Sequence, residues 1–351
     1  MDSILVEKEK RWYTLHKMRI AFVGKGGSGK TTLSKLLSTY LAEKNLTVVA
    51  IDADINQHLG TALGFSQKEL YGLPQLGEEI QKLKLYVRGK NKRLKTEEII
   101  KTTPPGRGSQ FITLEENNPL ITYFERKRNG VRFMAVGELA EEEIGVKCYH
   151  SKTGAVELLL NHLIDRENEY LVVDMTAGAD AFSSGLFTKF DFTIVVVEPT
   201  LKSIGVYQQY KKFTEHYHIQ LFAVGNKIET QDDVTFIESH IGEPLIASFL
   251  LLPAIKRSER EGSVHIEEEH REPLEKIYRR STQYKRDWLT YYEQTLEFHK
   301  KNALSWANTS FRSDLRRQID PDFDIIAAVS SYLLLLKGGE EYVLSIDKKN
   351  H

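Results

Sequence analysis

The sequence contains a single cysteine, Cys148, and lacks the run of roughly 18 apolar residues that a membrane-spanning helix needs. One cysteine cannot form a disulfide within the chain, which favours a reducing, cytoplasmic compartment. We expect no membrane span and no membrane partner. The first residues also lack the uninterrupted apolar segment of a secretory signal, so we expect residues 1–17 to form a short N-terminal arm.

An excess of one charge is missing as well. Lysine and arginine together number 48, and aspartate and glutamate number 49. Proteins that bind duplex nucleic acid usually carry a clear basic excess, so we do not expect a nucleic-acid partner. Apolar residues make up 41% of 351 residues, which is enough to bury the core of one large domain with an appendage.

Short apolar runs recur along the first two thirds of the chain and alternate with stretches of helical periodicity. The runs are residues 19–24, 47–52, 131–136, 170–175, 192–199, 221–226 and 245–253. Continuously apolar strands that alternate with helices are typical of a parallel sheet covered on both faces. We therefore predict an α/β fold over residues 18–257: a twisted, mostly parallel sheet of about seven strands with helices on both faces.

Two stretches depart from this pattern. Residues 84–110 are basic and then rich in proline and glycine, and we expect a solvated loop there, with a partner-docking loop as the alternative. Residues 258–351 contain no strand-like run, so we predict a C-terminal helical extension. Its aromatic and apolar residues recur every three or four positions between 274 and 306, which favours packing against the core or a second subunit over base stacking.

The strongest motif directly follows the first apolar run. It satisfies GxxxxGK[ST] in full, with Gly24, Lys25, Gly26, Gly27, Ser28, Gly29, Lys30, Thr31 and Thr32. Glycines allow the positive φ angles with which a loop wraps phosphates, and the positive end of the following helix points at them. We expect Lys30 to neutralise nucleotide phosphates and the Thr31 hydroxyl to bind Mg²⁺.

Lys25, the second residue of this loop, makes the motif a special variety. The residues KGGSGKTT resemble the deviant Walker A motif of a P-loop ATPase family. That family includes nitrogenase iron protein, the arsenite and tail-anchored-protein ATPases, the partition and septum-site ATPases and the nickel-insertion ATPases. The resemblance implies that the protein binds and hydrolyses ATP with Mg²⁺, and that Lys25 contacts nucleotide phosphate across the interface of an ATP-dependent homodimer.

The resemblance extends to two further strand ends. Asp52 and Asp54 match the family's switch I segment, in which Asp54 would orient the attacking water and Asp52 would hold Mg²⁺ through water. A buried strand that ends in Asp174 has the Walker B arrangement, so Asp174 would bind Mg²⁺ through water and Gly178 would sense the γ-phosphate. Open α/β sheets bind ligands at this carboxyl edge.

Two more segments match the same family. Glu198 lies in an EPT sequence that resembles a family strand end. Asn226 and Lys227 lie in a GNK turn, and the resemblance implies that Asn226 reads the adenine edge with Lys227 beside it. A guanine reader would carry aspartate where this chain has Glu229, whose side chain is one methylene longer, so we expect ATP rather than GTP.

Residues 18–257 resemble most closely the ATPases that mature carbon monoxide dehydrogenase by inserting nickel. In that branch a Gly-x-x-Cys-x-Cys segment binds metal at the dimer interface. This sequence has Gly145, Cys148 and His150 at the same spacing, so histidine replaces the second cysteine. Two such segments from two subunits would supply two thiolates and two imidazoles, a ligand set that suits Zn²⁺ and also Ni²⁺.

We interpret the chain as an ATP-driven homodimeric switch that matures a client protein, which in the branch it resembles is a metalloenzyme. Two alternatives stay open. A positioning ATPase of the partition or septum-site class would use a membrane-binding helix or a DNA-binding patch. A nucleotide-sensing scaffold would bind ATP with little turnover.

Overall fold

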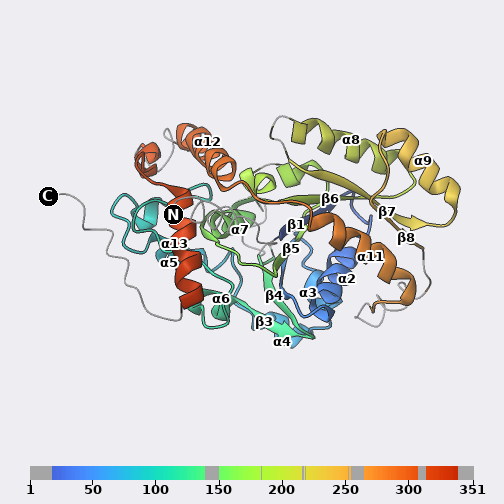
Figure 1. The fold of residues 1–351 in the computed structure, drawn as a ribbon, viewed down its shortest axis with the longest axis horizontal. Helices are drawn as coiled ribbons and strands as arrows, with labels where there is room; N and C mark the ends of the chain where they lie inside the picture. The colour runs from blue at the N-terminus through green and yellow to red at the C-terminus, as the bar shows by residue number, and fades with distance from the viewer. Residues whose placement is uncertain are drawn as a thin grey trace, which may run out of the picture.

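The computed structural model describes residues 18–138, 150–182, 184–215, 217, 219–251, 253, 265–306 and 314–338. An eight-stranded sheet runs through them in the order β3-β4-β2-β5-β1-β6-β7-β8 (Figure 1). The parallel strands are β1 Met18–Gly24, β2 Thr47–Ala53, β4 Val131–Ala135, β5 Glu169–Met175, β6 Phe192–Val197, β7 Leu221–Ile228 and β8 Ala247–Leu250. Each falls on one of the predicted runs, which confirms the fold class. The additional strand, β3 (Arg126–Arg128), is a short antiparallel edge strand beside β4.

Helices cover both faces of the sheet (Figure 1). The α-helices are α2 Lys30–Glu43, α3 Leu59–Ala62, α4 Gln67–Tyr71, α5 Ile80–Arg88, α6 Pro119–Phe124, α7 His150–His162, α8 Leu201–Glu215, α9 Gln231–Ile241, α11 Glu268–Ser281, α12 Trp288–Trp306 and α13 Ile325–Gly338. The 3-10 helices are η1 Thr96–Glu98, η3 Gly178–Phe182, η4 Gly185–Lys189 and η5 Leu315–Gln318. Within the described ranges no helix is both long and apolar enough to cross a membrane.

Successive residues of the central strand β1 enter two different cores. Ile20 and Phe22 pack with α2, α3 and α11 on one face, whereas Ala21 and Val23 pack with α7, α8 and α9 on the other. This alternation follows from the strand geometry, in which neighbouring side chains point to opposite faces. Because both faces are covered, every position of β1 is buried, which explains why its sequence is apolar except for Arg19.

The C-terminal extension packs against this sheet. Leu274 and Ile277 of α11 are fully buried in the core that α2 shares, and α11 lies beside α2 and β8 in Figure 1. Further along, Trp288, Tyr291 and Tyr292 belong to an apolar cluster with α13. These aromatic residues therefore pack in the interior of the protein, as their helical spacing predicted.

Residues 84–110 correct the prediction of a solvated loop. Leu94 and Ile99 are fully buried, and Ile100 of the same segment packs with Ala303 and Leu315 of the C-terminal extension. The Arg107 side chain donates to Asp320 at 2.9 Å, and Asp320 is 3% exposed. The Thr103 hydroxyl donates to the Gln318 side chain at 2.8 Å. Two arginines of the insertion, Arg93 and Arg107, thus pair with Asp320, more than 200 positions away, which a local composition argument cannot detect.

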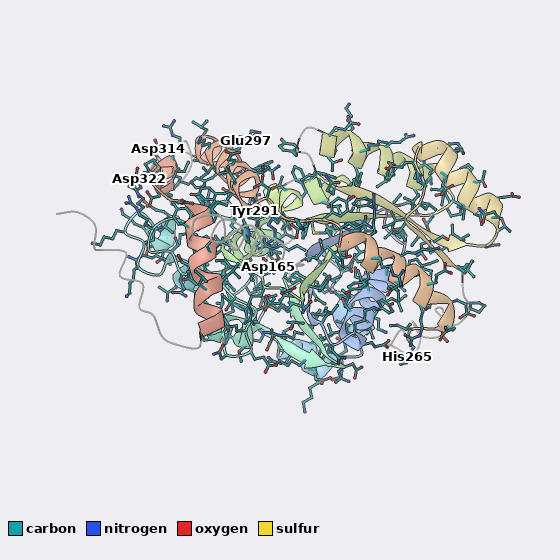
Figure 2. The ribbon with its side chains drawn as sticks, viewed as in Figure 1. Asp165, His265, Tyr291, Glu297, Asp314 and Asp322 are labelled. Atoms are coloured by element: carbon teal, nitrogen blue, oxygen red, sulfur yellow. The ribbon has the colours of Figure 1, made fainter. Side chains whose placement is uncertain are left out.

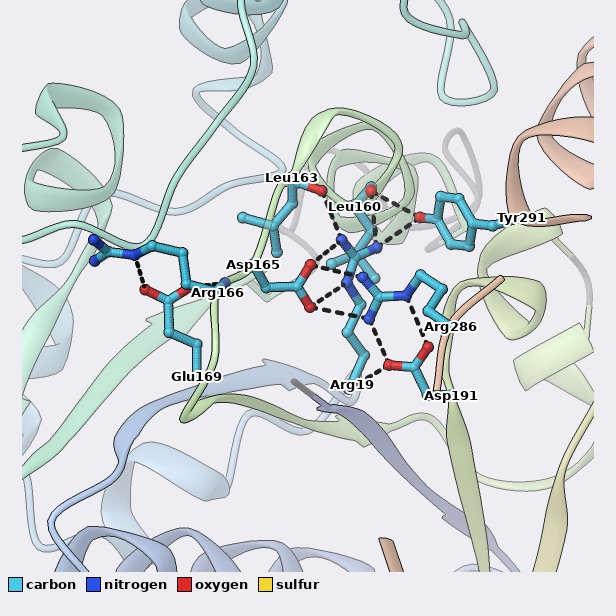
Figure 3. A network of polar contacts seen from close by, with 9 residues as sticks. All are labelled: Arg19, Leu160, Leu163, Asp165, Arg166, Glu169, Asp191, Arg286 and Tyr291. Carbon is cyan, nitrogen blue, oxygen red and sulfur yellow. Dashed lines mark hydrogen bonds and ion pairs between the residues drawn. The ribbon is translucent and has the colours of Figure 1, made fainter. Parts of the chain in front are cut away.

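A buried network of two arginines and two aspartates joins the extension to the start of the sheet (Figure 3). Arg19 of β1 and Arg286, just before α12, both bind the carboxylate of Asp165, at 2.8 and 2.6 Å. Arg286 also binds Asp191 at 2.5 Å, and Asp191 accepts a hydrogen bond from the Arg19 backbone amide at 2.8 Å. The charges of the four side chains cancel, which is the condition under which buried ions are tolerated.

The hydroxyl of Tyr291 on α12 completes the network. It accepts from Arg19 Nη1 and donates to the Leu160 carbonyl, both at 2.7 Å. Figure 2 shows Asp165 and Tyr291 in the interior, whereas Asp314 and Asp322 lie at the outer end of the C-terminal helices. The buried polar groups of α12 therefore form part of the junction between extension and sheet.

Replacing Arg286 with methionine tests this junction. The substitution leaves the negative charge of Asp191 buried without the guanidinium that faces it, so we expect the free energy of unfolding to fall by about 3–5 kcal/mol in a urea titration. Arg271→Met is the matched control, because Arg271 pairs with Glu43 at 3.1 Å and both side chains are more than 40% exposed. We expect the control to cost less than about 1 kcal/mol. Equal losses in the two variants would contradict a special role for the network.

Candidate functional site

The glycine-rich loop connects β1 to α2, as the sequence predicted. Its backbone φ is positive at Gly24, Gly27 and Gly29. Gly29 has φ +100°, which disfavours any residue with a Cβ, and such a Cβ would also lie 2.1 Å from Nδ2 of Asn226 and displace that side chain. The Asn226 amide donates to the Ser28 carbonyl at 2.7 Å. The predicted adenine reader is thereby held against the phosphate loop.

Of the two predicted switch I aspartates, Asp52 is the penultimate residue of β2 and Asp54 directly follows the strand. Oδ2 of Asp52 accepts from the Leu59 backbone amide at 2.8 Å, which fixes the carboxylate at the start of α3. Oδ1 of Asp54 accepts from the backbone amide and the side-chain amide of Asn56, both at 2.9 Å. Both aspartates are more than 90% buried, so hydrogen bonds rather than solvent hold their orientation.

Asp174 is brought to the same place by strand register. It pairs with Asp52 across the parallel strands β5 and β2. Thr31 Oγ1 donates to Asp174 Oδ2 at 2.5 Å, while Oδ1 of Asp174 is buried and has no hydrogen-bond partner among the described residues. The P-loop threonine and the predicted Walker B aspartate are therefore in direct contact.

The buried carboxylates at this edge repel one another, because too few positive charges lie beside them. Burial, and then the charge of Asp54, raises the pKa of Asp174 to about 7, although the Thr31 hydroxyl and Lys30 oppose the shift. Burial and then the charge of Asp174 also raise the pKa of Asp52 well above its ordinary value. A divalent cation would relieve this repulsion, and Mg²⁺ typically takes one or two carboxylates together with substrate phosphates. The residues present fit Mg²⁺.

Sequence reasoning assigned no role to Glu198, which the structure places at the centre of the site. Its carboxylate is 2.9 Å from Nζ of Lys25 and 2.7 Å from Nζ of Lys227. Nζ of Lys227 also donates to the Gly27 carbonyl at 2.6 Å. Burial would raise the pKa of Glu198, but the hydrogen bonds from Lys227 and Lys25 outweigh it and hold the pKa below its ordinary value. One carboxylate thus holds both lysines beside the phosphate loop.

The EPT motif marked Glu198 in the sequence, but its place in the site depends on strand register. It follows β6, which pairs with β1 so that Gly24 faces Val196, two positions before Glu198. A carboxylate at that point of a parallel sheet necessarily comes close to the residue after Gly24. The sequence alone does not give this strand register, so it could not show that Glu198 is a neighbour of the P-loop.

The remaining predicted residues are not all brought together. Gly178 begins η3 with φ +69°, and its carbonyl accepts from the Tyr210 hydroxyl at 2.7 Å. Cys148 lies outside the described residues, and His150 is the first residue of α7. Among the described residues no group of three or more His, Cys, Asp or Glu side chains could by itself hold a metal ion. The Cys148 and His150 metal site stays a prediction.

Comparison with known proteins identifies the family. A family model of the CobQ/CobB/MinD/ParA nucleotide binding domain matches residues 20–243, more than half of the chain. The chain belongs to this family. Its membership confirms the deviant Walker A resemblance and places the chain among the ATP-binding P-loop proteins. The match ends before α11, so the C-terminal extension lies outside the shared domain.

Two curated relatives match most of their own length. The carbon monoxide dehydrogenase accessory protein CooC from Rhodospirillum rubrum is 26% identical over 247 residues, covering 70% of this chain and 88% of its own. An uncharacterized ATP-binding protein from Methanocaldococcus jannaschii is 27% identical over 216 residues, covering 61% of this chain and 77% of its own. Neither alignment covers the whole chain.

Solved structures agree with the fold. A variant of McdA from Cyanothece in complex with ATP has a TM-score of 0.51 at 12% identity, and covers 78% of this chain and 99% of that one. A candidate plasmid partition protein from Borrelia burgdorferi bound to AMPPNP has a TM-score of 0.50 at 14% identity, covering 75% and 97%. At these identities the likeness establishes the fold alone.

Glu198→Gln tests whether the carboxylate competes with nucleotide for the two lysines. Neutralising it frees the positive charges of Lys25 and Lys227 for phosphate, so we expect a non-hydrolysable ATP analogue to bind about three- to tenfold more tightly, as measured by calorimetry. Glu272→Gln, a change at an exposed residue of α11, should leave the affinity unchanged. Weaker binding by Glu198→Gln would show that Glu198 instead supports the nucleotide-binding geometry.

Proposed function

We propose that the protein hydrolyses ATP to ADP and phosphate and uses the cycle to join and separate two copies of itself. The observation that carries this proposal is the meeting of the P-loop with three aspartates at one edge of the sheet. Thr31 touches Asp174, and Asp174 faces Asp52 across the strand pair. Phosphate-binding amides, a lysine and a cation site are the parts that phosphoryl transfer to water requires.

Each residue has a role in this proposal. Lys30 neutralises the phosphates, while Thr31, Asp52 and Asp174 hold Mg²⁺ directly or through water. Mg²⁺ supplies compensation for the charge on the phosphate oxygens. Asp54, whose carboxylate is held by Asn56, orients the water that attacks the γ-phosphate on the side opposite the ADP leaving group. The catalytic gain comes from positioning and charge stabilisation rather than from a covalent step.

Lys25 is the residue that makes the function depend on two subunits. Its side chain is one-third exposed, and Gly26 and Gly27 beside it are exposed. In the proposed dimer, Lys25 leaves Glu198 and reaches the phosphates bound by the partner subunit. A cation supplied in this way stabilises the charge of the transition state and makes hydrolysis conditional on assembly.

The proposal also concerns the client, that is, the protein on which the switch acts. The relative named as a carbon monoxide dehydrogenase accessory protein supports a role in maturing a metalloenzyme. The likeness to a partition protein keeps a positioning ATPase as the alternative at the level of fold alone. We favour maturation, because the curated relative aligns over 247 residues.

Asp54→Asn tests the proposed switch. We expect nucleotide affinity within about threefold of the parent and a single-turnover hydrolysis rate about 10²–10⁴-fold lower, because the residue that orients water is lost. The ATP-bound variant should stay dimeric in light scattering. Adding Lys25→Ala to it should return the protein to a monomer, and Asp232→Asn, an exposed control, should hydrolyse ATP at the parent rate. Unchanged turnover in Asp54→Asn would remove Asp54 from the mechanism.

Metal titration tests the client class. We propose that Cys148 and His150 from both subunits bind one Zn²⁺ or Ni²⁺ ion, because four soft ligands are needed for a stable site and one chain supplies two. Equilibrium dialysis should find one ion per two chains, bound more tightly with a non-hydrolysable ATP analogue. The variant Cys148→Ser/His150→Ala should lose it, whereas His265→Ala, a change at an exposed histidine, should keep it. Equal binding by the parent and the double variant, or none by either, contradicts this site.

A further inference from the structure

A side chain to which no role has been assigned ties the turn after β2 to the neighbouring strand. Nε2 of Gln57 donates to the Asp54 carbonyl at 2.6 Å, and Oε1 of Gln57 accepts from the Gly137 backbone amide at 3.3 Å. Gly137 lies just beyond the end of β4, which pairs with β2. One side chain thus connects the turn that carries Asp54 to a segment 80 positions away.

Gln57 takes the place of a peptide group between the two strands. Their regular pairing ends at Asp52, whose carbonyl accepts from the Val136 amide at 2.9 Å. A side-chain amide has an acceptor oxygen and N–H donors, as a backbone peptide group has. Gln57 uses both, and its Nε2 also lies 3.4 Å from the Asp52 carbonyl. The bridge between β2 and β4 therefore continues past the point at which the backbones stop pairing.

The Gln57 backbone is in the left-handed region, with φ +50°. Residues other than glycine rarely adopt this region, so surrounding contacts have to maintain it. Ile55, Asn56 and His58, the neighbouring residues of the turn, are exposed, whereas Gln57 is partly buried. The turn thus has its unfavourable backbone angle at the residue whose side chain reaches the end of β4.

The other end of the bridge is held by the segment that precedes α5. The Gly77 amide donates to the Val136 carbonyl at 2.9 Å, which joins this segment to the end of β4. Gly137 has φ +107°, and a Cβ there would lie 2.1 Å from Oε1 of Gln75. Gly137 is therefore enclosed between this segment and Gln57, and its amide gives the turn after β2 a fixed attachment point.

The proposed hydrolysis depends on where Asp54 is placed. Asn56 orients the Asp54 carboxylate from within the same turn. A contact inside the turn cannot set the distance between that turn and the phosphate loop, whereas the bridge from Gln57 to Gly137 can. That distance matters, because a displacement of about 1 Å can lower the rate of an enzymatic reaction by about 10²-fold.

We propose that Gln57 is a positioning residue for ATP hydrolysis. It holds the turn after β2 at the distance from the phosphate loop at which Asp54 orients the attacking water, and it contacts neither nucleotide nor water itself. The inference rests on the proposed function, because it uses the role of Asp54 given there. A residue that only stabilised the turn would instead affect folding and nucleotide binding, and the test separates the two roles.

Gln57→Met and Gln57→Glu test this role in steady-state assays of the full-length chain. Methionine has a similar length but makes neither hydrogen bond, so we expect kcat to fall about tenfold or more, with KM and the affinity for a non-hydrolysable ATP analogue within about twofold of the parent. Gln57→Glu keeps the acceptor for the Gly137 amide but at neutral pH places a charged oxygen against the Asp54 carbonyl. Its kcat relative to the parent should recover as the pH falls from about 8 to about 5.5, because the carboxylates of Asp52 and Asp54 favour its protonated form, which can donate again. Gln231→Met, a change at an exposed glutamine of α9, should hydrolyse ATP at the parent rate.

Asp54→Asn distinguishes a failure of this inference from a failure of the proposed function. In the Asp54→Asn background, Gln57→Met should lower the rate less than about twofold further, because the residue that it positions is already lost. If Asp54→Asn lowers the rate and Gln57→Met leaves kcat unchanged, or reduces analogue affinity as much as kcat, the positioning role is wrong and the role of Asp54 stands. If Asp54→Asn hydrolyses ATP at the parent rate, the proposed function itself loses Asp54. Thermal unfolding of each variant without nucleotide checks that the fold is retained.

Discussion

The buried contact of Arg19 and Arg286 with Asp165 and Asp191 is the constraint on which the architecture depends. Two of these residues lie at the starts of β1 and β6, one follows α7, and one precedes α12. Removing charges from water is costly, and the network is tolerated because all four charges are present and balanced. The C-terminal extension therefore supplies half of the positive charge at the base of the sheet, and the nucleotide-binding fold and its appendage are one structural unit at that point.

The candidate site depends on strand register rather than on any single loop. Asp52 and Asp174 belong to different strands and become neighbours because β2 and β5 pair in parallel. Glu198 comes close to Lys25 because β6 pairs with β1 on its other side. The parallel pairing that aligns the apolar strands also brings the charged residues at their carboxyl ends together at one edge of the sheet. Because these charged groups are buried, water solvates them poorly. A bound cation or phosphate would therefore change their interaction energies strongly.

Local patterns predicted most of this structure. The seven apolar runs became the parallel strands, and the P-loop follows β1 as its motif requires. What local patterns could not give was the partner of a distant residue. The insertion was expected to be solvated because it is basic, yet Arg107 binds Asp320 across 213 positions. Glu198 had a motif but no role until the register was known. The short strand β3 has the composition of a surface turn, with the sequence RKR.

The junction also has a consequence for synthesis of the chain. Arg19 is among the first described residues. Tyr291, which accepts from its guanidinium, and Arg286, which shares Asp165 with it, lie about 270 positions later. A ribosome that adds on the order of 5–20 residues per second leaves β1 without those partners for many seconds. During that interval the carboxylate of Asp191 lacks the Arg286 guanidinium that balances its charge, so its burial is unfavourable. The buried network at the amino-terminal edge of the sheet is thus completed only after residues 286–291 have been synthesised. A nascent chain that ends before residue 286 lacks it.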